Sequence, residues 1–502
     1  MNPLASPKCA RHVLMILAAI SSLLFTAGCG SSSSSGPPPL NGGFTNASLT
    51  GQYVIAQTGT SLNSQGNPDP FSEAIVFTAD GNGNLSITAD DGDQDGVPFT
   101  PLTSAVSGTY GINRDGTGFL QINYNPTINY AVTMIDDSHF YVIEQDVFAT
   151  TSGFGEKQDT TALTAAPSGN FVFKAHNIDT SSRVGGIAIA AGVISGNEDL
   201  LNFGFLASPT RAISTTVAMS TPDSNGRGTF TLNDGTSFNY YVVNSSKFHF
   251  VSNAGSLEIG QAEAQTAGSF SPATLAAGTS YVFGSSGDTS NPLGIHSAGV
   301  FTTDGNGNIE AGGSTTPGAV DYVQDATINS DLAVSGGTYT LASNGRGTIN
   351  LTLSGGSISP QIFWIVNGTS GYAYFLANSA AAVEDGTFSL QTPAPTIGSQ
   401  GAFVMDGIDT SFKDRVGVFE TSSSGFNWNQ AANAFDVSLD EYDPTSTGTN
   451  GTDTVSSNGR AAVVVNGITP TLVFYLSAPN TGFMVQEDGA TIGGAFAQQA
   501  SQ

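Results

Sequence analysis

One short segment has the residue types and the spacing of an oxygen-ligand metal site. In Asp91-Gly92-Asp93-Gln94-Asp95-Gly96, three carboxylates alternate with other residues before a glycine that can form a sharp turn. Calcium loops begin in this way, with carboxylate oxygens brought around one point. The twelfth position, where a complete loop of this kind has a bidentate Glu, is Leu102. Two interpretations follow: a Ca²⁺ site at Asp91, Asp93 and Asp95, or a solvated acidic loop.

The second candidate for a chemical role is Cys29. A basic head with Lys8 and Arg11 precedes a 13-residue apolar run, Val13 to Phe25, which is too short for a confident membrane span. The tetrapeptide that follows, Thr26-Ala27-Gly28-Cys29, resembles the lipobox of bacterial lipoproteins, although Leu is usual in place of Thr26. The resemblance implies that residues 1–28 are a signal peptide, that Cys29 carries acyl chains, and that the protein is anchored in the cell envelope. Gly30 resembles the residue that follows the lipid site in lipoproteins of the outer membrane.

The charge of the chain excludes one class of partner, and its cysteine count excludes stabilisation by disulfides. Without Lys8 and Arg11 the mature chain has 11 basic against 40 acidic residues, so it cannot neutralise the phosphates of a nucleic acid. Cys9 would leave with the signal, and Cys29 alone cannot form a disulfide within the chain. Folding must then rely on packing and sheet hydrogen bonds.

No catalytic motif is found in the sequence. The histidines after the signal show neither metal-ligand spacing nor a repeated partner, and there is no nucleophile elbow, phosphate loop or cysteine nucleophile. An arginine recurs in Asn-Gly-Arg turns at Arg227, Arg346 and Arg460, where a structural ion pair is the expected role. We therefore expect no catalytic residues and no cofactor other than the Ca²⁺ considered above.

An internal repeat fixes the architecture. A Gly followed five positions later by a Gln occurs at Gly153, Gly260, Gly386 and Gly493, at intervals of 107, 126 and 107 residues. Units one and three share Phe-Thr-x-Asp-Gly-Asn-Gly-Asn, whereas units two and four share Ile-Asp-Thr-Ser, so the order is A-B-A-B. The expected organisation is a Ser/Pro/Gly-rich tether over 29–46 and four β units over 47–160, 165–267, 274–392 and 397–499.

Each unit is predicted to be all-β. Unit one contains eight segments with alternating apolar residues, joined by tight turns near 80–83, 114–116 and 136–138 and by long loops near 59–72 and 90–106. An eight-stranded up-and-down meander with one tight end and one loop-rich end resembles the lipocalin-like barrels of the calycin group. A two-sheet sandwich is the alternative fold. In a barrel, the strand with the Gly-to-Gln signature would close against the first strand.

Three functions are compatible with these features. The first is a non-enzymatic, lipid-anchored protein whose β scaffold presents loops for binding or adhesion to an extracellular or periplasmic ligand. The second, which the lipocalin resemblance implies, is a carrier of small apolar ligands inside the barrels. The third is a β-rich enzyme that acts on carbohydrate.

Overall fold

The computed structural model describes residues 43–500 apart from 63–67, 146–148, 178–179, 204, 206–209, 290–293, 312–317, 357, 380, 399, 408–412, 423–424, 435–445, 466–467 and 488–490. The signal peptide, Cys29 and most of the tether lie outside the described residues. Among the residues described, the helical elements are two short 3-10 turns, η2 (Asn46–Ser48) and η3 (Pro272–Thr274), and no helix is long and apolar enough to cross a membrane.

The described strands form four antiparallel barrels, named A to D in chain order. Barrel A contains β1 (Thr50–Leu62), β2 (Pro68–Asp80), β3 (Asn84–Gln94), β4 (Val97–Pro98), β5 (Val106–Ile112), β6 (Thr117–Ile122), β7 (Ile128–Met134), β8 (His139–Glu144) and β9 (Ala149–Lys157). Barrel B contains β10 (Gly169–Asn177), β11 (Ser181–Ala190), β12 (Val193–Asn202), β13 (Arg211–Val217), β14 (Arg227–Leu232), β15 (Ser237–Asn244), β16 (Lys247–Ser252) and β17 (Glu258–Ala264). Barrel C contains β18 (Thr279–Thr289), β19 (Ile295–Thr303), β20 (Asn308–Ile309), β21 (Ala319–Gln324), β22 (Thr327–Leu341), β23 (Arg346–Leu353), β24 (Gln361–Asn367), β25 (Tyr372–Ala377) and β26 (Ala382–Leu390). Barrel D contains β27 (Gln400–Gly407), β28 (Lys413–Ser422), β29 (Gly425–Ala434), β30 (Ser446–Val455), β31 (Arg460–Val465), β32 (Ile468–Ala478), β33 (Thr481–Glu487) and β34 (Ile492–Gln498).

All four barrels close by pairing the last strand with the first, as predicted, and the sandwich alternative is excluded. The closing pairs are β1 with β9, β10 with β17, β18 with β26, and β27 with β34. Barrels A and C each contain a short extra strand, whereas barrels B and D have eight strands. In barrel A, β4 pairs with the end of β3, and in barrel C, β20 and β21 share the third position between β19 and β22. This difference follows the A-B-A-B order of the repeat.

The tight turns are where the sequence placed them, but two of the expected long loops are strands. In the turn after β2, Asp80 accepts hydrogen bonds from the backbone N–H groups of Asn82 (2.7 Å) and Asn84 (3.0 Å). In contrast, β1 and β2 extend well into 59–72, and β3 continues through the acidic segment as far as Gln94. The extensions of β1 and β2 pair with each other, and that of β1 also pairs with β9 of the same barrel. In β3, Asp91 binds Arg227 and Tyr241 of barrel B, a contact that the local sequence does not reveal.

The barrel interiors are filled by aromatic and aliphatic side chains. In barrel B, for example, Phe230, Phe238 and Phe250 stack with ring centroids 5.1 to 6.2 Å apart. An apolar residue that precedes the first strand joins each core: Phe44, Leu163, Phe270 and Ile397. Filled cores leave the interior of each barrel little room for a ligand.

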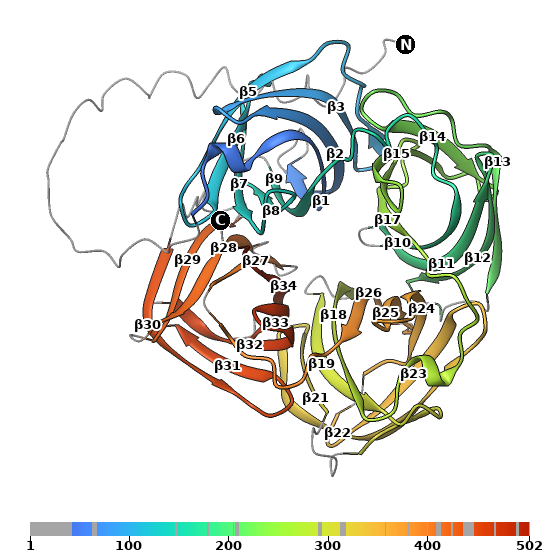
Figure 1. Ribbon diagram of the computed structural model, residues 1–502, viewed down its shortest axis with the longest axis vertical. Coiled ribbons are helices and arrows are strands. Elements are labelled where there is room, and N and C mark those ends of the chain that lie inside the picture. Colours follow the sequence, from blue (N-terminus) through green and yellow to red (C-terminus); the bar gives the residue numbers. More distant parts are fainter. Residues whose placement is uncertain are drawn as a thin grey trace, which may run out of the picture.

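The four barrels form a closed ring (Figure 1). Strands one to three of each barrel pack against strands six and seven of the next, and barrel D meets barrel A in the same way, through β27 and β28 against β7 and β8. Head-to-tail contacts of this kind produce a ring when the rotation closes. We call the four interfaces the A–B, B–C, C–D and D–A joints.

A glutamine after the last strand of each barrel forms hydrogen bonds with the next barrel. The Nε2 of Gln158 donates to the backbone carbonyls of Asn225 (2.9 Å) and Val242 (2.7 Å) in barrel B. The same two bonds recur from Gln265 to Asn344 and Ile365, from Gln391 to Asn458 and Leu476, and from Gln499 to Asp115 and Met134. The repeated glutamine therefore stabilises the ring in addition to following the closing strand.

The fourth copy of this signature is one residue later than the spacing indicated. Gly494 lies opposite Met405 of the first strand, as Gly153 lies opposite Gln57, and so Gln499 takes the place of Gln158. Gln498 is exposed. The sequence was ambiguous here because two glycines and two glutamines are adjacent in unit four.

Three joints share a buried ion pair that an aromatic side chain covers, and we call this set the charged triad. At the B–C joint, Arg346 donates to Asp199 through Nη2 (2.6 Å) and Nε (2.9 Å), and Trp364 Nε1 donates to the same carboxylate at 3.0 Å. The A–B triad is Asp91, Arg227 and Tyr241, and the C–D triad is Asp321, Arg460 and Tyr475. The recurring arginines thus form structural ion pairs, as expected, with partners in the preceding barrel.

Candidate functional site

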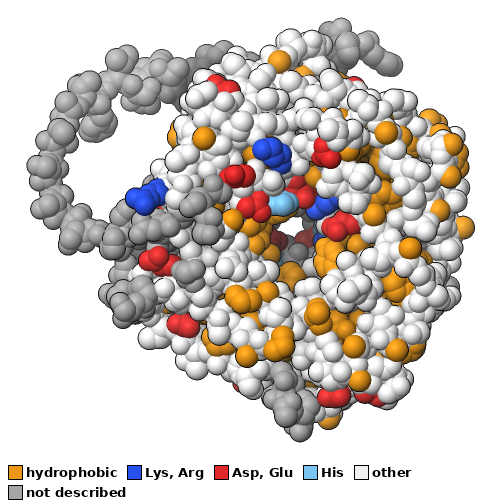
Figure 2. All heavy atoms as spheres, viewed as in Figure 1, with side chains coloured by type: hydrophobic (Ala, Val, Ile, Leu, Met, Phe, Trp, Pro, Cys, Tyr) orange, Lys and Arg blue, Asp and Glu red, His pale blue; other side chains and the backbone are white. Residues whose placement is uncertain are grey.

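The ring encloses a channel at its centre, which is lined by charged and polar side chains together with apolar groups. Its volume is about 710 Å³, and all four barrels contribute to its wall. Figure 2 shows the molecule hollowed at this point, with acidic and basic side chains around the opening. The first and last strands of each barrel face the channel (Figure 1), and the lining residues lie toward the ends of these strands that carry the longer connections.

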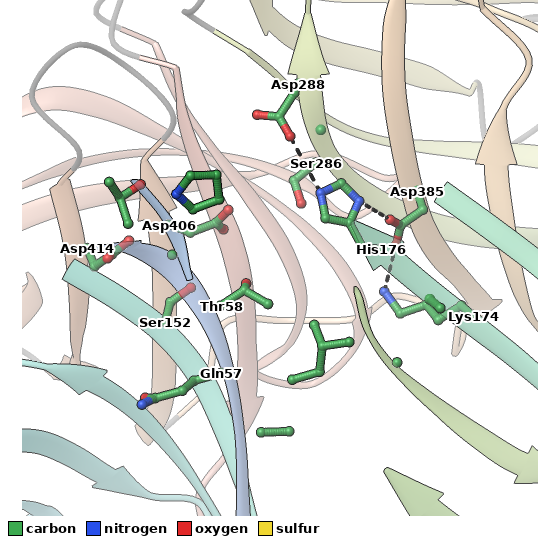
Figure 3. Close-up of a pocket in the computed structure, with 18 of the residues that line it drawn as sticks. Gln57, Thr58, Ser152, Lys174, His176, Ser286, Asp288, Asp385, Asp406 and Asp414 are labelled. Carbon is green, nitrogen blue, oxygen red and sulfur yellow. Dashed lines mark hydrogen bonds and ion pairs between the residues drawn. The ribbon is translucent and has the colours of Figure 1, made fainter. Parts of the chain in front are cut away.

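The wall between barrels B and C holds a network of charged groups (Figure 3). Lys174 Nζ lies 2.9 Å from Asp385 Oδ1, and His176 Nδ1 lies 2.9 Å from Asp385 Oδ2. The other ring nitrogen of His176 is 3.5 Å from Asp288, and Ser182 donates to Asp385 at 3.0 Å. Both nitrogens of the imidazole are therefore held by carboxylates.

The electrostatics of this wall keep the imidazole protonated. Burial lowers the pKa of His176, but the carboxylates of Asp288 and Asp385 raise it further, to about 10. Burial alone would raise the pKa of Asp385, yet Lys174 and His176 hold it well below its usual range. A histidine that stays cationic at neutral pH is poorly suited to act as a general base, which requires a pKa near the working pH.

The wall formed by barrel D is acidic. Asp414 is buried at the D–A joint, where Thr150 of barrel A donates to it at 2.5 Å. Burial, together with the nearby charge of Asp406, raises the pKa of Asp414 to about 7. Asp406 lies 3.6 Å from the Nε2 of the buried His296 in barrel C, a group whose pKa is lowered by burial. This wall can therefore accept positive charge.

The channel departs from the fourfold repeat in the residues that line it. One position of the first strand lies opposite the residue that precedes the signature glycine of the last strand. It is Thr58 in barrel A, His176 in B, Ser286 in C and Asp406 in D, and all four side chains lie around the channel in Figure 3. The structural glutamines are the same in all four copies. The scaffold is thus repeated, whereas the channel presents a different polar group from each side.

The predicted acidic segment is divided between the A–B joint and the surface. Asp91 binds Arg227 and Tyr241, and Asp95 is exposed. Asp93 is buried; burial raises its pKa to about 6, opposed by backbone N–H groups that include those of Leu257 and Gly255.

A calcium site at these residues stays a prediction. Among the described residues, no group of three or more His, Cys, Asp or Glu side chains is arranged to hold a metal ion. In the described chain the three carboxylates have separate neighbours.

The channel residues were not identified from the sequence. The sequence contains one indication of them. Lys174 and His176 are two positions apart on one strand, so they face the same side, in a chain that has only 13 Lys and Arg residues. Asp288, Asp385, Asp406 and Asp414 carry no local pattern, because each reaches the channel only through the arrangement of four separate barrels.

Comparison with known proteins adds no relative to this description. No family model matches the chain, and no curated protein matches it significantly. The functional argument therefore rests on the residues of the channel.

Proposed function

We propose that the protein is an exported, lipid-anchored binding protein without enzymatic activity, and that its ligand site is the central channel. The proposed ligand is a small polar molecule that carries a protonated amine. The observation that carries the proposal is the channel itself, a space of about 710 Å³ that all four barrels line and into which several aspartates project. Ligand sites of proteins commonly enclose 300–1,000 Å³.

The charge of the lining supports a cationic ligand. Five aspartates line the channel, at positions 69, 288, 385, 406 and 414, and the cations that accompany them are Lys174 and the protonated His176. Both cations are already paired with Asp385. Because the channel is walled by protein, its excess negative charge attracts a cation more strongly than the same charge would in water.

The filled cores favour this proposal over the apolar carrier that the lipocalin resemblance implied. A cavity inside barrel B encloses about 20 Å³, which is enough for a single water molecule. The binding of His176 by two carboxylates likewise favours binding over proton transfer. Loops that present an adhesive surface remain an alternative in which the channel is incidental.

Anchoring through Cys29 is part of the proposal and rests on the sequence alone. The mature chain is strongly acidic, so electrostatic attachment to anionic lipid is unfavourable and acyl chains would have to supply the affinity. The tether would then hold the ring away from the bilayer.

The experiment combines native mass spectrometry with a matched pair of probes. Protein purified without denaturation is expected to carry one small basic molecule per chain. Thermal shift with 1,4-diaminobutane should raise the melting temperature of the wild type, whereas 1,4-butanediol, which has the same length without charge, should not. The double variant Asp406→Asn/Asp414→Asn should lose the response, and Asp95→Asn, which removes an exposed charge outside the channel, should keep it. Absence of both a bound molecule and a diamine response would contradict the proposal.

A further inference from the structure

The four joints of the ring repeat one design, but the D–A joint lacks its charged part. The first residue after the turn glycine is Arg227, Arg346 or Arg460 at three joints, and at the D–A joint it is Thr117. Its cross-strand neighbour is Tyr241, Trp364 or Tyr475 at those three joints and Thr133 at the D–A joint. The buried carboxylate, Asp91, Asp199 or Asp321, is replaced by Ala431. The D–A joint therefore has neither the ion pair nor the aromatic side chain of the triad.

The apolar contact at this joint is less completely buried. Eight buried residues and one partly buried residue form the cluster at each of the A–B, B–C and C–D joints, whereas five buried and five partly buried residues form the cluster at the D–A joint. Two of the five buried residues, Ala131 and Ala402, are alanines. In the described chain half of the apolar residues at the D–A joint are therefore still partly exposed, and only apolar surface that is removed from water contributes to the attraction between packed sheets.

The chain topology adds a third difference. Barrels A and B, B and C, and C and D are each joined by a short linker, so parting one of these joints leaves the two barrels tethered. Barrels A and D are the first and the last along the chain, and no linker joins them directly. The hydrogen bonds across this joint include those of Gln499 and the bond from the backbone N–H of Ala500 to the carbonyl of Ile135 (2.8 Å), which have equivalents at the other joints. Side chains add bonds from Gln400 to the carbonyl of Asp115 (3.1 Å), from Asn429 to the carboxylate of Asp115 (3.2 Å) and from Thr150 to Asp414 (2.5 Å).

The D–A joint also forms part of the channel wall. Thr150 of barrel A and Asp414 of barrel D both line the channel, and they meet across this joint. Separation of barrels D and A would therefore open the channel from its side, without any strand leaving its barrel.

We propose that the D–A joint is a gate: the ring opens there, reversibly, while the other three joints stay closed, and solutes enter the channel through the opening. The proposal concerns the ring itself and holds whether or not the ligand is an amine. Segments that open are drawn from the less stable regions of a protein, and among the described residues the D–A joint differs from the other three in having neither a charged triad nor a linker between its two barrels.

Thiol labelling at equivalent positions tests the gate. In a Cys9→Ser/Cys29→Ser background the chain has no cysteine, and one can be introduced at a time. The first set is Val54→Cys, Val172→Cys, Val282→Cys and Ala402→Cys, whose parent side chains are all fully buried at the four joints. The second set is Ala74→Cys, Val184→Cys, Ala298→Cys and Val416→Cys, also buried one to a joint. In the first set the D–A variant enlarges an alanine, and in the second it shortens a valine, so a packing artefact would act in opposite directions.

The expected result is that Ala402→Cys and Val416→Cys react with 5,5′-dithiobis(2-nitrobenzoic acid) about tenfold or more faster than the other members of their sets, under native conditions. A tenfold rate ratio corresponds to a difference of about 1.4 kcal/mol in opening free energy. A disulfide between cysteines at 135 and 500 should slow both reactions to the rate of the other joints. Equal rates at all joints would overturn the proposal, as would a faster rate in one set only or a rate that the disulfide leaves unchanged.

Discussion

Removal of the positive charge from one charged triad should weaken the joint that contains it, and the B–C joint allows this effect to be measured most clearly. Asp199 is fully buried, and its partners are Arg346 and the indole N–H of Trp364. Arg346→Met keeps the aliphatic stem of the side chain but leaves the carboxylate with the indole alone. Breaking a buried pair in this way typically costs about 3–5 kcal/mol.

The structure favours the lower end of this range. About a quarter of the Arg346 side chain is exposed (24%), so water can partly replace it, and the bond from Trp364 is retained. We therefore expect a loss of about 3 kcal/mol in the free energy of parting or unfolding at this joint. The double variant Asp199→Asn/Arg346→Met should be less damaging than the single one, because no charge is left stranded.

The assay uses the two tryptophans of the chain. Trp364 lies at the B–C joint and Trp428 in the core of barrel D, so Trp428→Phe leaves a fluorophore that reports on this joint alone. Urea titration followed by that fluorescence gives the midpoint for each variant in the same background. If Arg346→Met unfolds with the wild-type midpoint, or if the double variant is less stable than Arg346→Met, the triad does not hold the joint as described.

Four further predictions follow from the same contacts. Gln499→Ala should cost about 1–3 kcal/mol, because the carbonyl of Met134 loses the side-chain donor and that of Asp115 keeps only Gln400. Gln498→Ala, at the adjacent exposed position, should cost little, and comparison of the two urea midpoints checks the register of the fourth unit. The pKa of Asp414 is raised in the folded ring, from 3.8 to about 7, so its contribution to stability is complete below about pH 4 and is lost as the pH rises through 7. Asp414→Asn should remove this part of the dependence of stability on pH. An unchanged dependence would show that another group titrates. Cys29→Ser should release the protein from the membrane fraction, and a variant that stays bound would exclude the lipid anchor. If calcium binds the acidic segment, it should raise the melting temperature of the wild type and not of Asp93→Ala; equal responses would exclude the site.

The fold of each unit could be read from the sequence because its signals are local. The alternation of apolar residues marks strands, and Asp80 with Asn82 and Asn84 makes a turn through contacts that span four residues. The repeat gave the number and order of the units. It also drew attention to the glutamine after the last strand, although its partners in the next barrel could not be inferred.

The ring and its channel depend on contacts between residues far apart in the chain. Asp199 and Arg346 are 147 positions apart, and nothing near either residue specifies the other. Asp91 was interpreted as part of a loop because its partner, Arg227, belongs to another unit. The lining of the channel was harder still to foresee, since the equivalent positions hold four different residue types and the repeat gives no sign that they meet.

The central claim is that the four barrels form a closed ring, and a disulfide across the D–A joint tests it most directly. The backbone N–H of Ala500 donates to the carbonyl of Ile135 at 2.8 Å, so the two residues lie side by side across the joint. In a Cys9→Ser/Cys29→Ser background, Ile135→Cys/Ala500→Cys should oxidise within one chain and give a monomer of higher mobility on a non-reducing gel. Ile135→Cys/Thr392→Cys is the matched control, because Thr392 makes the equivalent bond at the C–D joint. A ring predicts the bond in the first pair and not in the second; an open row of barrels would form neither, and that result would contradict the account.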